Sequence, residues 1–189
     1  PSVSEVDGKN YSRNLCNFID GQWECINWSG TTTWNPGDVV IPQSEEELSA
    51  FLRNNENTIK VVGHAHSWSS IFVPRQGGVS LILRNLSGIV NMGPTYVDVR
   101  AGGSFVDLHR ELEEAGLAVA WLSGGIQGLS IGGAVSVGFH GSQMSVGSIS
   151  TIITYMEVYD TDGVRHILDK QTPLALSADV LFLLAKSPV

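Results

Sequence analysis

Apolar and polar positions in the first half of the chain predict a strand, a helix and a second strand. Residues 38–41 are predicted to form a short strand, and the segment after it places Leu48 and Leu52 at helical spacing. Ser44 opens that segment as the first residue of a capping box, which is typical of a helix start. The apolar run 59–63 follows. Because two strands joined through a helix usually pair in parallel, the pattern predicts a βαβ unit.

Further strands and helices are predicted downstream. Residues 95–102 alternate strictly between apolar and polar, as a half-buried strand does. A helix is expected to begin at the capping residue Ser104 and to stop at Gly116. The other expected elements are a strand over 79–86, two strands around an Asp162–Gly163 turn, and a helix over 176–189.

The first 35 residues differ from the rest of the chain. They are polar and turn-rich, and they contain Trp23, Trp28 and Trp34. We therefore expect residues 1–35 to form an N-terminal arm that lies across the domain of residues 36–189 and adds no element to its core.

The composition is that of a globular protein and excludes some function classes. Hydrophobic residues make up 42% of the chain and charged residues 16%. The net charge of −8 argues against a general nucleic-acid binder, which needs a basic surface. No run of 18 apolar residues occurs, so no transmembrane helix is expected.

Two features favour a secreted protein over a cytoplasmic one. Cys16 and Cys25 lie nine residues apart and are either a small disulfide loop or two free thiols. Glycosylation sequons occur at Asn10, Asn27 and Asn85, although such triplets also arise by chance. We expect secretion or the lumen of the secretory pathway, with a cytoplasmic protein as the alternative.

The stretch "VVGHAHSWSS" follows a predicted buried strand and places two histidines in a glycine- and serine-containing loop. Loops at the carboxyl edge of a sheet are where α/β proteins bind ligands, and backbone N–H groups of such a loop can hold a phosphate. A His-x-His pair also suits a metal, but no second cluster has ligand spacing, so no metal is expected. The candidate binding residues are Val62, Gly63, His64, Ala65, His66, Ser67, Trp68 and Ser69.

A second glycine-rich segment spans residues 122–148 and contains eight glycines. Glycine this dense suits a backbone that approaches a ligand closely, and the apolar residues between the glycines are unlike a linker. A glycine-rich turn around a core histidine is the alternative. The candidate residues here are Gly132, Gly133, Ser136, Gly138, His140, Gly141 and Ser142. Together the two segments favour one extended ligand such as a dinucleotide.

Both segments resemble the FAD-binding motifs of flavoenzymes of the vanillyl-alcohol oxidase type, which have a PCMH-type FAD-binding domain. The first resembles the pattern V-x-G-x-G-H-S, with Ala65 in place of the second glycine. The second resembles G-G-x-x-S-x-G-T-H-G-S, with Phe139 at the threonine. The stretch "INWSGTTTWNPGDVVIPQSEEEL" is similar to the opening of the sugar-lactone and alditol oxidase branch, and the resemblance covers residues 26–185.

The resemblance implies an α+β fold with a small parallel βαβ subdomain and a second, mixed sheet with flanking helices. It implies FAD as cofactor and oxidation of a C–OH group of a sugar, sugar lactone or polyol. The hydride would pass to flavin N5 and then to dioxygen, giving hydrogen peroxide.

The resemblance also implies a role for one histidine of the pair. His66 falls where many family members bond a histidine nitrogen to the 8α-methyl carbon of the flavin, and a neutral imidazole is a competent nucleophile near physiological pH. His66 is therefore the candidate for covalent FAD, and His64 is expected to be a loop residue.

Family members are much longer than this chain, because a substrate domain follows the FAD domain. We expect a truncated form, with a companion chain carrying the substrate domain as one alternative, and the sequence assigns no general base. A second hypothesis is a shortened, secreted FAD-domain scaffold that binds a partner without catalysis.

Overall fold

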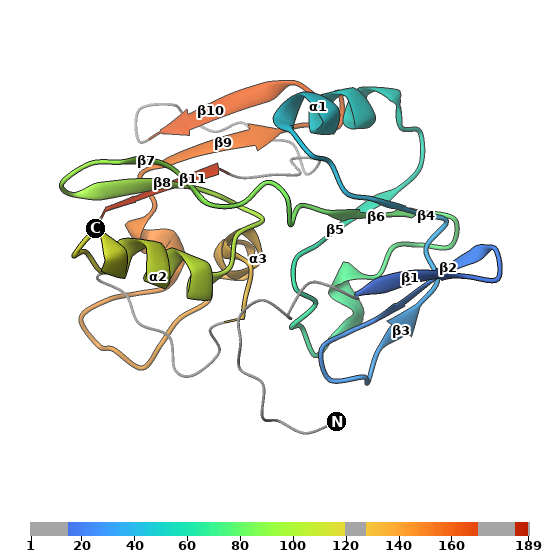
Figure 1. The fold of residues 1–189 in the computed structure, drawn as a ribbon, viewed down its shortest axis with the longest axis horizontal. Helices are drawn as coiled ribbons and strands as arrows, with labels where there is room; N and C mark the ends of the chain where they lie inside the picture. The colour runs from blue at the N-terminus through green and yellow to red at the C-terminus, as the bar shows by residue number, and fades with distance from the viewer. Residues whose placement is uncertain (1–14, 120–127, 170–183, 189) are drawn as a thin grey trace.

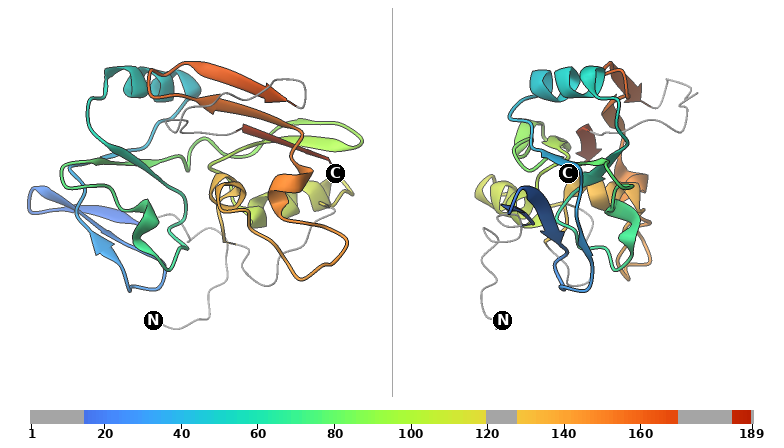
Figure 2. Two further views of the ribbon diagram at one scale, coloured as in Figure 1. Left: turned by 180° about the vertical axis from the view of Figure 1, so that it is seen from behind. Right: turned by 90° about the vertical axis from the view of Figure 1, so that its right-hand side faces the viewer.

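The computed structural model describes residues 15–119, 128–169 and 184–188. Its strands form three sheets, drawn in Figures 1 and 2. Strands β1–β3 and strands β7–β10 lie at opposite ends of the molecule, with β4, β5 and β6 between them. No helix within these described ranges is long and apolar enough to cross a membrane.

The predicted βαβ unit is confirmed. Strands β4 (Asp38–Val40), β5 (Ile59–Val62) and β6 (Val79–Ile82) form a parallel sheet in the order β4-β6-β5. Helix α1 (Glu45–Asn54) connects β4 to β5. Ser44 caps it by accepting a hydrogen bond from Glu47 N–H at 3.3 Å, while the Glu47 carboxylate accepts from Gln43 N–H at 2.8 Å. The helix start is therefore fixed by its own local sequence.

The second sheet has five strands in the order β10-β9-β11-β8-β7, and all its described pairings are antiparallel. The expectation of a mixed sheet is corrected in this respect. Its strands are β7 (Ile89–Met92), β8 (Tyr96–Arg100), β9 (Tyr155–Tyr159), β10 (Arg165–Asp169) and β11 (Leu184–Pro188).

The helix expected over 176–189 is wrong where the structure describes it. Residues 176–183 lie outside the described residues, but 184–188 form β11, which pairs with β8 on one side and β9 on the other. An apolar run of this length suits a helix or a buried strand equally well. The strand forms because its backbone groups pair with the otherwise unpaired edges of β8 and β9.

Helices cover the five-stranded sheet. Helix α2 (Phe105–Glu114), helix α3 (Ile131–Ser136) and the 3₁₀ turn η2 (Ile149–Ile152) pack on β8 around Val97 and Val99, on the side shown below the sheet in Figure 1. Ser104 caps α2 as predicted, and Gly116 follows its end at a φ of 71°. Helix α1 contacts β9 instead: Tyr159 lies in one cluster with Leu48 and Leu52, and its hydroxyl donates to Glu45.

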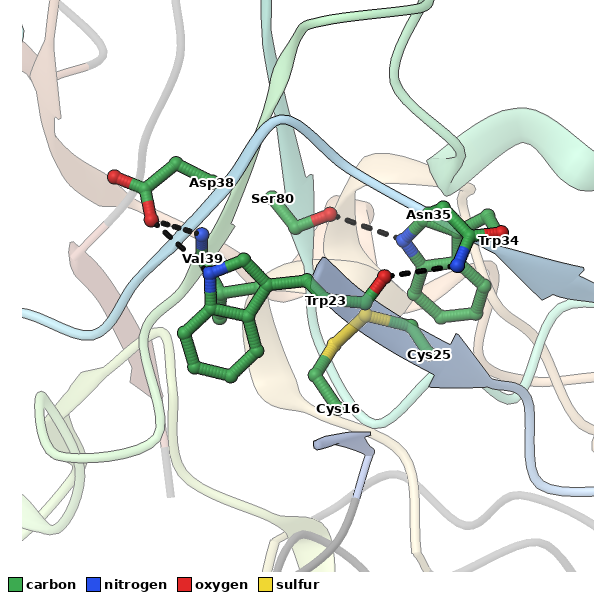
Figure 3. Close-up of a disulfide and its surroundings, with 8 residues drawn as sticks. All are labelled: Cys16, Trp23, Cys25, Trp34, Asn35, Asp38, Val39 and Ser80. Atoms are coloured by element: carbon green, nitrogen blue, oxygen red, sulfur yellow. Dashed lines mark hydrogen bonds between the residues drawn. A yellow bond between two sulfur atoms is a disulfide. The ribbon is translucent and has the colours of Figure 1, made fainter. Parts of the chain in front are cut away.

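Residues 15–35, the described part of the expected N-terminal arm, contribute to the core, contrary to our expectation. Strands β1 (Cys16–Ile19), β2 (Gln22–Ile26) and β3 (Thr33–Trp34) form an antiparallel sheet. Cys16 and Cys25, directly opposite each other, are joined by a disulfide (Figure 3). Trp34 is 5% exposed and donates its indole N–H to the hydroxyl of Ser80, which lies inside β6, at 3.0 Å. Burying a large aromatic ring stabilises the fold when its N–H finds an acceptor, as the Trp34 indole does. The segment therefore becomes part of the core.

The five-stranded sheet, the parallel sheet and helix α3 meet at a buried backbone junction, residues 101–103. Gly102 N–H donates to Leu86 O at 3.0 Å, just after β6, and Gly103 O accepts from Ile131 N–H at 2.8 Å, at the start of α3. A Cβ atom on Gly102 would lie 1.9 Å from Leu83 O. The junction therefore admits glycine alone at this position, because the obstacle is backbone that has no room to shift.

Gly102→Ala is predicted to lower the free energy of unfolding by more than about 2 kcal/mol, because the added methyl group must displace the backbone after β6. Urea unfolding of the purified chain measures this. Gly116→Ala is the control: that glycine has a φ of 71° and no atom within 4 Å of an added Cβ, so its cost is the strain of about 1 kcal/mol alone. Equal losses in the two variants would contradict the packing argument.

Candidate functional site

The loop after β5 carries both histidines at the carboxyl end of the parallel sheet. Val62 is buried as the last residue of β5, and Gly63 begins the loop. Ala65 is buried and has a φ of 47°, in the left-handed region that costs an L-residue about 1 kcal/mol. This is the position at which the family pattern has glycine, so the loop keeps the conformation without the usual residue.

The two glycine-rich segments come together at this loop. His64 Nδ1 lies 2.6 Å from Gly128 O, and because a carbonyl only accepts, the histidine donates from Nδ1. A Cβ atom on Gly63 would lie 2.0 Å from the Ser130 hydroxyl. The loop after β5 and the start of α3 are therefore in direct contact, across 64 residues of sequence.

The fold itself requires glycine at several positions of the second segment. The N–H of Gly132 donates to Ala101 O at 2.9 Å, and a Cβ on Gly132 would lie 3.0 Å from the Ala101 methyl group. The N–H of Gly133 donates to the Ser130 hydroxyl at 3.3 Å. Gly138, with a φ of 61°, follows the end of α3. Packing and helix termination explain these three glycines, and the first N–H groups of α3 are engaged within the fold.

The last residues of the second motif lie in an exposed turn. Ser136 still belongs to α3 and donates its hydroxyl hydrogen to Gly132 O at 2.7 Å. His140 and Ser142 are exposed, and His140 Nδ1 pairs locally with Gly141 O at 3.1 Å. Residues 122–127 of the segment lie outside the described part of the chain. The ligand roles of all these residues stay predictions.

Two residues from the N-terminal segment reach this site, and our reasoning from sequence assigned them no role. Trp28 stacks on the imidazole of His66, with ring centroids 5.3 Å apart and an interplanar angle of 12°. Trp68 packs edge-on against Trp28 at 4.9 Å. Asn27 is 3% exposed and donates its amide hydrogen to Ser67 O at 3.4 Å. The signal available in the sequence was the Asn-Trp pair of the family-like opening.

Asn27 also bears on the glycosylation sequons. Its amide nitrogen lies 3.1 Å from the Ser29 hydroxyl and 3.2 Å from that of Thr31, and its oxygen accepts from Thr32 N–H at 3.0 Å. An amide nitrogen buried in this way has no room for a glycan in the folded chain. Asn85 is exposed, and Asn10 lies outside the described residues.

Burial controls the charge of the histidine pair. Desolvation lowers the pKa of His64, against the raising effect of its bond to Gly128 O. Desolvation, followed by the proximity of His64, lowers the pKa of His66. Both imidazoles are therefore neutral near physiological pH, which leaves each ring a nitrogen lone pair. Within the described ranges, no group of three or more His, Cys, Asp or Glu side chains is placed to hold a metal.

Comparison with known proteins places this geometry in context. A family model described as "FAD binding domain" matches residues 36–169. A D-arabinono-1,4-lactone oxidase of Candida glabrata is 34% identical over 167 residues, covering 83% of this chain and 31% of that protein. An alditol oxidase of Streptomyces sp. is 28% identical over 139 residues (72% and 33%), and an L-gulonolactone oxidase of Mus musculus is 29% identical over 145 residues (72% and 32%).

The chain thus spans about a third of the length of these curated relatives. Among solved structures, a cholesterol oxidase from Brevibacterium sterolicum superposes with a TM-score of 0.69 at 22% identity. The match covers 93% of this chain and 38% of that one. At this identity the likeness shows the fold alone, and it agrees with the expected α+β architecture.

The histidines predict how stability depends on pH. The pKa values of His64, His66 and His109 are all lowered by burial from the unfolded value of 6.5. Below that pH the unfolded chain binds protons that the folded chain does not. The free energy of unfolding is therefore highest above about pH 6.5 and falls as the pH drops. Urea unfolding at about pH 7.5 and about pH 5.5 measures this loss.

His64→Asn is expected to reduce the acid-side loss, because asparagine keeps a donor for Gly128 O but does not titrate. The same substitution at the exposed His140 is the control. An unchanged pH dependence in His64→Asn would contradict the assignment.

Proposed function

We propose that this chain, which belongs to the FAD binding domain family, is the FAD-binding part of a flavin-dependent oxidase acting on a C–OH group of a sugar, sugar lactone or polyol. The substrate class is taken from the relatives, which are lactone and alditol oxidases by name. The observation that carries the proposal is the contact between the two FAD motifs, through the 2.6 Å bond from His64 to Gly128 O.

The residues of the site suit an anionic, aromatic cofactor. Within the described ranges, no hydrogen-bond acceptor faces the N–H groups of Ala65 and Ser67, which leaves them for the pyrophosphate. The hydroxyls of Ser67 and Ser69 lie 3.0 Å apart beside them. Exposed Trp68 and the His66–Trp28 stack offer aromatic surface to the flavin end.

Bound FAD would supply the redox chemistry, accepting a hydride from the C–OH carbon and passing the electrons to dioxygen to form hydrogen peroxide. The residues of this chain bind and orient the cofactor. We place the substrate-binding groups in sequence beyond these 189 residues or on a companion chain, since the relatives are about three times as long.

We further propose that His66 carries the FAD covalently. Its imidazole is neutral, lies in the loop matched to the first FAD motif, and is held by the stack with Trp28. Forming the bond would break a C–H bond of the flavin methyl group and the N–H bond of the imidazole, and would make one C–N bond. The two electrons and two protons released would reduce dioxygen to hydrogen peroxide.

Absorbance of the purified chain before and after acid precipitation tests both statements. Flavin bands that stay with the pellet, and a flavin peptide containing His66, are the expected result. His66→Ala is expected to release the flavin to the supernatant while some non-covalent FAD still binds, and His109→Ala, outside the site, keeps the wild-type pattern. Flavin that stays covalent in His66→Ala would refute the covalent assignment.

A non-catalytic, shortened scaffold is the alternative function. It predicts a chain that stays colourless after FAD is added, whereas the oxidase predicts a yellow one. No bound flavin under any loading condition would therefore move the conclusion to the scaffold.

We also propose that the chain matures in an oxidising, secretory compartment. The Cys16–Cys25 disulfide and the exposed sequon at Asn85 support this. Mass spectrometry of the chain expressed through a secretory pathway is expected to find a glycan on Asn85 and none on Asn27, whose amide is buried. The substitution Asn85→Gln should remove that glycan. An unmodified Asn85, or a glycan on Asn27 of the folded chain, would contradict this proposal.

A further inference from the structure

Trp28 lies against His66 and belongs to the turn that joins β2 to β3 in the N-terminal sheet. The two rings are nearly parallel, at 12°, with centroids 5.3 Å apart. Trp28 nevertheless keeps 46% of its surface exposed, so burial of its apolar area only partly explains why a tryptophan occupies this position. The stack, in which the indole covers one face of the imidazole, is the second explanation.

The backbone on both sides of His66 is held by the same turn. Trp28 N–H donates to Ala65 O at 3.3 Å, and the Asn27 amide donates to Ser67 O at 3.4 Å. Asn27 is in turn fixed by Thr32, whose N–H donates to its side-chain oxygen at 3.0 Å. The carbonyl groups of Ala65 and Ser67, the two neighbours of His66, are thus tied to Trp28 and Asn27, and the His66 ring lies on the indole.

We propose that Trp28 is a positioning residue for His66, holding its imidazole against the indole in the orientation in which it joins FAD. This proposal rests on the proposed function of His66 as the FAD-bearing residue. Trp28 acts through His66 and is not itself a catalytic residue. Asn27 serves the same purpose from the backbone side, and its burial makes the turn rigid.

Burial also favours the neutral form of the imidazole. Desolvation lowers the pKa of His66, and the proximity of His64 lowers it further. The indole of Trp28 covers one face of this ring. Only the neutral ring has a lone pair for bond formation. Removing the indole is therefore expected to affect both the orientation and the proton affinity of one side chain.

The first measurement is an NMR titration of the His66 imidazole in the flavin-free chain, assigned with His66→Gln. Trp28→Ala is expected to raise the pKa of His66 toward its ordinary value, and Trp28→Phe to keep it near that of the wild type. Trp23→Ala is the matched control: it removes a tryptophan from the same N-terminal sheet, where the ring packs on Phe18 and donates to Asp38. It should leave the His66 titration unchanged.

The second measurement is the rate at which acid-stable flavin appears on the chain after FAD is added. We expect a loss on the order of tenfold or more in Trp28→Ala, because a misoriented nucleophile loses the benefit of its position. Trp28→Phe should recover most of the rate and Trp23→Ala should keep it. A purely structural role would not give this rescue by a second aromatic ring.

The outcomes separate the two proposals. An unchanged His66 titration in Trp28→Ala, or an unchanged rate of flavin attachment, overturns the positioning role. A wild-type chain that takes up no flavin, but whose His66 titration still moves in Trp28→Ala, refutes the proposed function and supports the positioning of His66 by Trp28.

Discussion

Close approach of backbone to backbone at residues 101–103 is the constraint on which the rest of the structure depends. Three segments meet there with no room for a side chain at Gly102: the end of β8, the turn after β6, and the start of α3. Their hydrogen bonds join main-chain groups directly, as between Gly132 N–H and Ala101 O at 2.9 Å. Buried main-chain groups must be paired, so this junction fixes where α3 lies relative to the parallel sheet.

The candidate site is a consequence of that junction. Because α3 begins at the junction, Gly128 and Ser130 are placed against the loop after β5, where His64 donates to Gly128 O. The two FAD motifs thus touch directly, and the junction at residues 101–103 sets the position of the second one. The N-terminal sheet also reaches this loop. The bond of Trp34 to Ser80 anchors the sheet to β6, and the Cys16–Cys25 disulfide joins β1 to β2 within it (Figure 3).

Three sources therefore build one loop environment. The parallel sheet supplies His66, the second motif supplies the partner of His64, and the N-terminal turn supplies Asn27 and Trp28. All three lie within a chain that spans about a third of the length of its curated relatives.

The sequence by itself determined what depends on near neighbours. The starts of α1 and α2 follow from Ser44 and Ser104, whose side chains accept hydrogen bonds from residues three positions away. The parallel pairing of β4, β5 and β6 follows from a helix between apolar runs, and both FAD motifs are contiguous strings of residues. Interactions between residues close in sequence can be predicted from the sequence alone.

Only the tertiary structure decided what depends on distant partners. Residues 184–188 are a strand because β8 and β9 offer unpaired edges, and Trp34 is buried because Ser80, 46 residues away, accepts its N–H. Asn27 is a buried anchor and not an exposed glycan acceptor because Ser67 lies beside it. In each case the deciding free energy is that of pairing or burying a group against residues far along the chain, which no local pattern of apolar and polar positions specifies.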